Sequence, residues 1–129
     1  MQGLEATRLL LYPVDAMSET KGHEHSTIRE RLRAQGDADA IRITAHAHQE
    51  MVAEDILLQD VMDVLRDAVV LENYAEHKRG PCCLVCGRTA RGRYVHVVCT
   101  TSLETAIIIT VYEPQPPKWP TPFDRGVTR

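Results

Sequence analysis

The stretch from residue 82 to residue 112, CCLVCGRTARGRYVHVVCTTSLETAIIITVY, decides the fold of this chain. Apolar and β-branched segments alternate in it with short polar connections, which is the pattern of consecutive antiparallel strands. Gly92 lies in the first connection and can adopt the positive φ that a tight hairpin requires. We therefore predict three strands, at residues 82–89, 94–100 and 105–112.

The last of these strands is apolar on both faces of its pleat. Residues 106–111 read AIIITV, and such a run is typical of a central strand that is covered from above and below. Strict alternation places Ile107 and Ile109 on one face. The other face then carries Ala106, Ile108 and Thr110.

The residues before this stretch supply the helices. A Ser-Thr pair followed by an acidic residue predicts a helix that starts at residue 26 and ends near Gly36. The apolar periodicity then predicts a strand at 40–44, helices at 45–53 and 58–67, and a strand at 69–74. This order predicts an α+β fold in which two to three helices pack on a four-stranded, mainly antiparallel sheet, with a meander in the C-terminal half.

The length of 129 residues suits a single core. Residues 1–25 are poorly patterned and are expected to form a loosely structured extension of one domain at 26–129. The tail at 113–129 is rich in proline, so we expect it to lie extended on the surface, held by Trp119 or Phe123. No apolar run is long enough to span a bilayer and no secretory signal is evident, which favours a cytoplasmic location.

Charge is divided unevenly along the chain. Residues 77–129 hold eight Lys/Arg and three Asp/Glu, whereas residues 1–76 hold seven and fifteen. A basic half that forms the sheet fits an anionic ligand there, and it fits a solvated surface with chance clustering equally well.

Several motifs together resemble one bacterial family. They are ITAHA at 43–47 followed by Met51, PCCLVCG at 81–87, GRYVHVV at 92–98, ITVYEP at 109–114, and Trp119. The chain resembles the DUF4258 family, a domain of unknown function, over roughly residues 41–119. One position departs from the family pattern, because Glu50 stands where an Arg usually precedes the Met.

That family is similar in element order to RelE/ParE-type toxins of bacterial toxin–antitoxin pairs, whose active members cut messenger RNA. The resemblance implies a RelE-like architecture and a type II toxin that acts as a metal-independent endoribonuclease. It also implies an antitoxin-like protein as partner, RNA as a possible substrate and no membrane association. No cofactor is expected.

Cleavage of RNA without a metal needs a general base, a general acid and cations around the phosphate. His46 and His96 match the family motif and have the near-neutral pKa that proton transfer requires. Tyr112 is a further proton donor. The phosphate would be held by the arginines around the hairpin turn, Arg88, Arg91 and Arg93.

Each of these residues also has a structural interpretation. His46 can tie its helix to the sheet, His96 can simply face outward from its strand, and the arginines can be solvated. A rival hypothesis is a zinc site formed by Cys83, Cys86, His96 and Cys99, whose CxxC spacing suits that metal. Its alternative is buried reduced thiols, since residues 83 and 86 point to opposite faces of a regular strand.

Three functions therefore remain open from the sequence. The first is the toxin-like ribonuclease. The second is a non-catalytic protein-interaction module that binds another protein through its sheet, and the third is a small zinc-stabilised binding domain.

Overall fold

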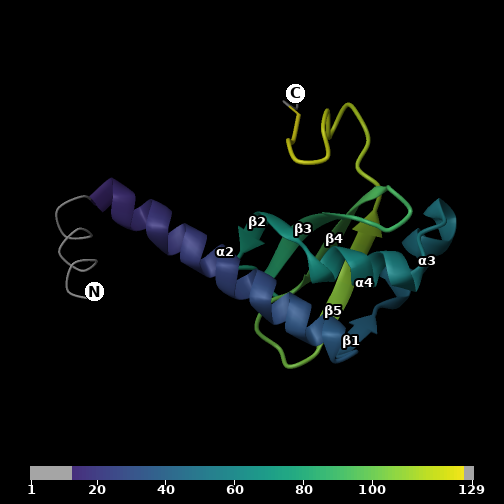
Figure 1. Cartoon of the computed structure of the whole chain (residues 1–129), viewed down its shortest axis with the longest axis horizontal. Coiled ribbons are helices and arrows are strands. Elements are labelled where there is room, and N and C mark those ends of the chain that lie inside the picture. Colours follow the sequence, from purple (N-terminus) through teal and green to yellow (C-terminus); the bar gives the residue numbers. More distant parts are fainter. Residues whose placement is uncertain (1–12, 127–129) are drawn as a thin grey trace.

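The computed structural model describes residues 13–126, without the side chains of residues 13–21 and His23. Its elements in chain order are α2 (Pro13–Asp37), β1 (Ile41–Ile43), α3 (Ala45–Glu54), α4 (Leu58–Arg66), β2 (Val69–Tyr74), β3 (Cys82–Arg88), β4 (Tyr94–Thr100) and β5 (Ala106–Tyr112). The described residues thus form an α+β fold of three helices and one five-stranded sheet (Figure 1).

The sheet is mixed, with the strand order β1-β5-β4-β3-β2. Strands β2 to β5 form the predicted antiparallel meander, and Gly92 has the predicted positive φ of 86° in its hairpin. The prediction of four strands is wrong, because β1 adds a fifth strand parallel to β5. Local patterning does not reveal this pairing, since the two strands are far apart in the sequence. The middle strand is consequently β4 rather than β5.

One face of the sheet is covered by the helices. Leu32 of α2, Met51 of α3 and Leu65 of α4 are buried in one cluster with strand residues such as Val85 and Val97. Figure 1 shows α2 and α4 lying in front of the strands. This face holds the hydrophobic core.

A glycine allows α4 to approach the sheet closely. At Gly87 of β3, an added Cβ would lie 2.8 Å from the Cα of Val64 on α4. Real Cβ atoms essentially never come so near to backbone, so only glycine fits here.

Helix α2 begins at Pro13, well before the predicted start at residue 26. Proline suits the first position of a helix because it has no N–H to leave unpaired there. Ile28 and Leu32 of this helix are buried against the core. The rest of the expected N-terminal extension, residues 1–12, lies outside the described residues.

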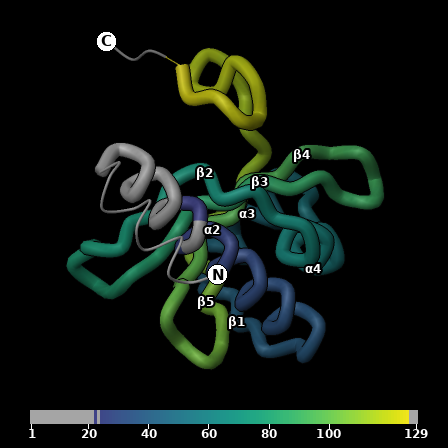
Figure 2. Tube along the Cα trace, turned by 60° about the vertical axis from the view of Figure 1, so that its left-hand side comes forward, coloured from purple at the N-terminus to yellow at the C-terminus, as the bar shows by residue number. Residues whose placement is uncertain are grey.

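The C-terminal segment after β5 is not extended along the surface. Figures 1 and 2 show it as a compact coil beyond one end of the sheet. Among the described residues, no helix is both long and apolar enough to cross a membrane.

Candidate functional site

The side of the sheet that faces away from the helices carries a cluster of polar side chains. We call it the second face; β3 and β4 contribute Cys82, Leu84, Cys86, His96 and Val98 to it, in cross-strand register. Although none of the described helices covers this face, His96 is fully buried. His96 is the centre of the candidate site.

A β-bulge brings Tyr112 to the second face. Val98 pairs with Thr110 and Cys99 pairs with Ile108, so Ile109 is an extra residue in β5. Because one inserted residue reverses the alternation of the strand, Thr110 and Tyr112 face away from the helices, opposite to Ile108. The predicted grouping of Thr110 with Ile108 is therefore wrong.

A second bulge acts in the same way on β2. Val70 pairs with Val85 and Glu72 pairs with Leu84, so Leu71 is the extra residue. Val70 consequently packs in the core, whereas Glu72 joins the second face. Two bulges thus aim Glu72 and Tyr112 toward the side of the sheet that carries His96.

Both ring nitrogens of His96 are engaged. Nδ1 lies 3.1 Å from the hydroxyl of Tyr112, and Nε2 lies 2.6 Å from the carbonyl oxygen of Pro122. A carbonyl oxygen only accepts hydrogen bonds, so Nε2 carries a hydrogen. In the neutral ring Nδ1 then accepts the hydrogen bond of the Tyr112 hydroxyl.

The C-terminal segment closes the site from outside. The ring of Trp119 packs edge-on against His96 with centroids 4.4 Å apart, and Trp119 is buried as predicted. Arg125 donates two hydrogen bonds to the carboxylate of Glu72, of 2.8 and 2.9 Å, and its guanidinium lies 4.8 Å from the centre of the Trp119 ring. Phe123 stays largely exposed and packs against Tyr94.

Burial and neighbouring charges shift the pKa values of the titratable groups in the site. Burial lowers the pKa of His96 below its usual 6.5 and raises that of Tyr112 above 10.0. Burial and the neighbouring Glu72 carboxylate raise the pKa of Tyr74 to about 12. The hydrogen bonds from Arg125 are the largest cause that lowers the pKa of Glu72. At neutral pH His96 is therefore uncharged and both tyrosines keep their protons.

His46 does not join this cluster. It is exposed on α3, and its Nε2 lies 3.3 Å from a carboxylate oxygen of Glu50. His46 and His96 therefore share no solvent-open cleft, because His96 is buried. The interpretation of His46 as the tie between helix and sheet is also wrong. That tie is made by Thr44 and Glu50, which hydrogen-bond to Ile109 and Val111 of β5.

Two of the three hairpin arginines are engaged by protein groups. Arg91 pairs with the buried Asp60 at 2.5 Å. Arg93 donates to the carbonyls of Glu54 and Asp55 at the end of α3 and pairs with Glu113. Burial would raise the pKa of Asp60, but hydrogen bonds from Arg91 and the Leu57 N–H hold it below its usual value. The two arginines thus anchor the hairpin to the helices.

Arg88 differs from them. Its guanidinium lies 5.7 Å from the centre of the Tyr94 ring, and its side chain is exposed at the rim of the second face. Among the predicted phosphate ligands, Arg88 is therefore the one whose charge is available to a ligand.

The four predicted zinc ligands do not converge. Cys83 and Cys99 are buried in the core, whereas Cys86 and His96 pair across β3 and β4 on the second face. Among the side chains that the structure describes, no group of three or more His, Cys, Asp or Glu residues is arranged to hold a metal. Burial raises the pKa of Cys86 to about 11, as expected of a reduced buried thiol.

Sequence reasoning named His96 and Tyr112, which are in contact, but it did not name Glu72 and Arg125. The bulge at Leu71 turns Glu72 to the second face, which strict alternation does not predict. Arg125 lies in a segment without a repeating pattern, so its position could not be predicted from periodicity either. The signal that could have found Arg125 is Trp119, because a buried aromatic in a tail implies that the neighbouring residues also meet the sheet.

A family model described as a domain of unknown function, DUF4258, matches residues 43–113, which is more than half of the chain. The match includes His96 and Tyr112 and ends before Trp119 and Arg125. No curated protein and no solved structure matches the chain. The similarity to RelE/ParE-type toxins therefore stays a prediction.

Proposed function

The chain belongs to the DUF4258 family, and from this premise we propose that it is the toxin-like member of a type II toxin–antitoxin pair. In this proposal it is a metal-independent endoribonuclease that acts on messenger RNA through the second face of its sheet. The observation that carries the proposal is the contact between His96 and Tyr112, 3.1 Å apart.

The proton affinities of this pair suit the two roles that RNA cleavage requires. A neutral imidazole can accept the proton of a ribose 2′-hydroxyl, and a protonated phenol can donate to the departing 5′-oxygen. Burial lowers the pKa of His96 and raises that of Tyr112, so at neutral pH the imidazole is free to accept a proton and the phenol holds one to donate. Groups whose environments push their pKa values apart are typical of acid–base pairs in active sites.

The reaction follows from these roles. Nε2 of His96 takes the 2′-hydroxyl proton while the 2′-oxygen attacks the phosphorus. The bond from phosphorus to the 5′-oxygen breaks, and the leaving oxygen takes the proton of Tyr112. The products are a 2′,3′-cyclic phosphate and a 5′-hydroxyl, and the charge that builds on the phosphate is stabilised by Arg88.

The C-terminal segment has to move before this reaction can start. The Pro122 carbonyl occupies Nε2, and Trp119 covers the ring. Once the carbonyl leaves, the ring hydrogen can shift to Nδ1 and be donated to the Tyr112 oxygen. Nε2 is then free to accept a proton, and the Tyr112 hydrogen is free to be given.

The test is cleavage of labelled RNA by purified protein in the presence of a chelator. We expect wild-type protein to produce cyclic-phosphate ends, Trp119→Ala to cleave faster, and Tyr112→Phe to lose about 10²–10⁴-fold in rate, the usual contribution of a general acid. Tyr94→Phe is the matched control, because it removes a hydroxyl that makes no hydrogen bond to the described residues. Absence of cleavage by both wild type and Trp119→Ala would disprove the ribonuclease.

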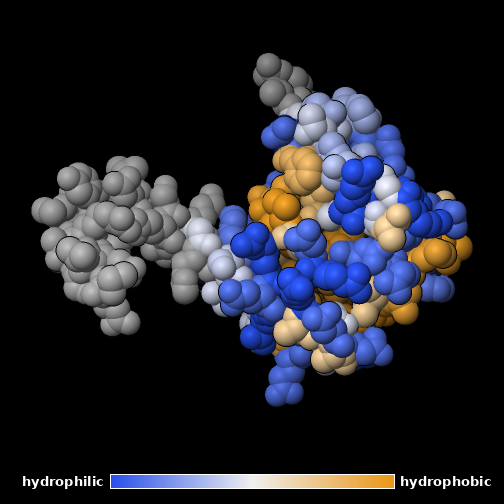
Figure 3. All heavy atoms as spheres, in the orientation of Figure 1, coloured by the Kyte–Doolittle hydropathy of each residue, from blue (hydrophilic) through white to orange (hydrophobic). Residues whose placement is uncertain are grey.

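A second candidate function, a non-catalytic protein-interaction module, is favoured by a different surface. Val52, Leu57 and Leu58 are exposed around a hollow of about 580 Å³ between α3 and α4. Figure 3 shows apolar surface on the side where Figure 1 places α3. Induced expression in bacteria separates the candidates. If Tyr112→Phe still arrests growth and Leu58→Gln does not, the interaction module replaces the ribonuclease.

A further inference from the structure

Three arginines line one pocket on the helical side of the molecule. We call it the arginine pocket; it lies where α2 meets the end of α4 and has a volume of about 230 Å³. Its lining residues are Ser26, Arg29, Glu30, Arg33, Arg66, Asp67 and Ala68. Residues 1–76 carry only seven basic side chains in total, so three of them at one pocket is a marked concentration.

The charges of this pocket are largely available to a ligand. Arg29 and Arg33 make no hydrogen bond or ion pair with any side chain that the structure describes. Arg66 lies 3.6 Å from Asp63 and remains more than half exposed. Two acids also line the pocket, yet neither Glu30 nor Asp67 pairs with an arginine there.

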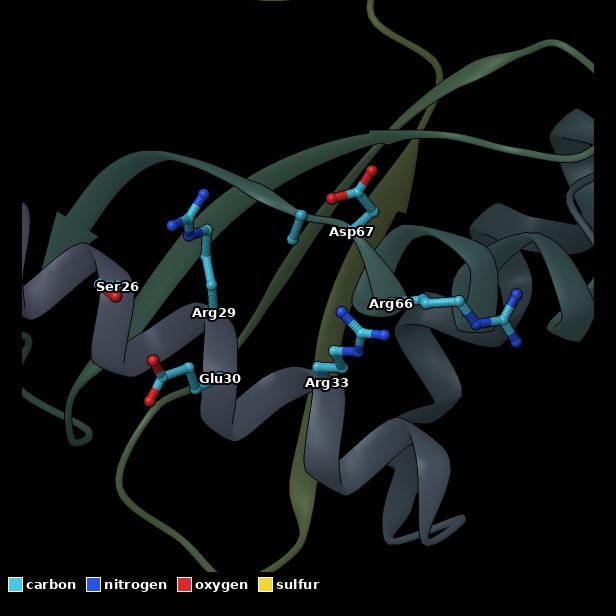
Figure 4. Close-up of a pocket in the computed structure, with 7 residues that line it drawn as sticks. Ser26, Arg29, Glu30, Arg33, Arg66 and Asp67 are labelled. Carbon is cyan, nitrogen blue, oxygen red and sulfur yellow. The ribbon is translucent and has the colours of Figure 1, made fainter.

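The arrangement of the arginines suits a chain of phosphates better than a single ion. In Figure 4 the three guanidinium groups follow one another across the view, with Arg33 between Arg29 and Arg66, and the Arg66 side chain extends away from α2. In the same view Glu30 extends away from the row. A guanidinium binds two oxygens of one phosphate at once, so a row of three matches successive phosphates of one strand.

The pocket and the candidate active site lie at the same position along the strands of the sheet. Ala68 directly precedes Val69, which pairs with Cys86, and Cys86 pairs with His96. Neighbouring strands are about 4.8 Å apart, so roughly 10 Å of sheet separates the backbones of Val69 and His96. Because β2 is an edge strand, a nucleic acid strand can pass around that edge from the pocket to the second face.

We propose that the arginine pocket binds consecutive phosphates of a single-stranded RNA whose scissile bond lies at His96 and Tyr112. The choice of RNA as the source of the phosphates rests on the proposed function. The pocket then acts as a remote anchor, which holds the substrate without touching the reacting atoms.

The test is binding of a fluorescein-labelled oligouridylate, measured by anisotropy at increasing KCl concentration, in the Tyr112→Phe background that slows cleavage. Each phosphate contact contributes about −0.7 to the slope of log K against log[salt] for single strands. Replacing Arg29, Arg33 and Arg66 together by Gln should therefore reduce the slope by about 2. A control with the same loss of charge replaces Arg42, Lys78 and Arg79, which are exposed elsewhere.

Equal slopes for the two triple variants would overturn the site. The single change Arg33→Gln, with an expected loss of about 0.7 in slope and an unchanged melting temperature, keeps the test valid if the triple variant folds poorly. Orthophosphate should displace the RNA no better than KCl of equal ionic strength. If it does so better, the pocket is a site for free phosphate and the RNA assignment fails.

The outcome also separates this inference from the proposed function. RNA that binds through the arginine row but is never cut would refute the ribonuclease and leave the binding site standing. RNA that both triple variants bind with equal slopes, while the enzyme with Tyr112 restored still cleaves it, would refute the binding site alone.

Discussion

At the scale of single residues, Glu50 departs from the arginine that the family resemblance leads one to expect, and it makes a hydrogen bond to the sheet instead. Its carboxylate accepts the N–H of Val111 at 2.9 Å and lies 3.3 Å from His46. The family resemblance leads one to expect an arginine at this position, and an arginine cannot accept that hydrogen bond. Glu50 is thus a structural group in this chain.

We expect Glu50→Ala to lower the free energy of unfolding by about 1 kcal/mol, because the Val111 N–H loses its partner at a partly exposed site. Glu50→Gln should cost less, since its amide oxygen still accepts. His46→Ala, the control on the same turn of α3, should stay within about 0.5 kcal/mol. Urea unfolding measures all three, and a large loss for His46→Ala would restore its role as the tie to the sheet.

The buried His96 makes stability depend on pH. Its folded pKa lies below the unfolded value of 6.5, so the unfolded chain binds the proton first as the pH falls. Stability is therefore complete above pH 6.5 and decreases as the pH drops toward the folded pKa. Glu72 and Asp60 act separately, because their stabilisation is lost only below their usual values near 4.

We predict that the denaturant concentration at the unfolding midpoint of the wild-type protein decreases as the pH is lowered below about 6.5. In His96→Gln this part of the decrease should disappear, although the baseline stability changes. Denaturant melts at several pH values provide the measurement. Parallel curves for the two proteins would mean that His96 titrates normally.

At the scale of elements, the sequence predicted the strands better than the direction of their side chains. The predicted bounds of β4 and β2 agree with the structure, since residues 94–100 and 69–74 were expected. The two bulges were not predicted, because an inserted residue such as Ile109 has the same apolar character as its neighbours. The position of Glu72 on the second face was consequently overlooked.

The neighbouring isoleucines of β5 differ in burial. Ile108 is fully buried, whereas Ile107 on the opposite face is half-buried. We expect Ile108→Ala to cost about 2–5 kcal/mol, as for other large-to-small core changes, and Ile107→Ala clearly less. Equal losses, measured by chemical denaturation, would indicate that both faces of β5 are covered to the same degree.

At the scale of the whole molecule, the sheet separates two compartments that contain natural thiol probes. Cys83 and Cys99 lie in the core with the helices. Cys82 and Cys86 lie on the second face. Long-range packing of the C-terminal segment defines the second compartment, and this could not be predicted because proline-rich sequence carries no periodicity.

We predict that Trp119→Ala accelerates alkylation of Cys86 by iodoacetamide without accelerating that of Cys83 or Cys99. Loosening the C-terminal segment should expose only the thiols of the second face, since the helical core stays intact. Mass spectrometry of labelled peptides gives the separate rates. Uniform acceleration at all sites would show instead that Trp119 stabilises the whole fold.

Two carboxylates of α3 protect part of the edge of β5 against pairing with a strand of another chain. Where β1 ends, Glu50 and Glu54 accept the N–H groups of Val111 and Glu113, so this stretch of β5 offers no free donors to an incoming strand. An unprotected strand edge invites sheet extension and aggregation. Here a helix supplies the missing acceptors, so growth of the sheet by strand addition is directed to the outer sides of β1 and β2.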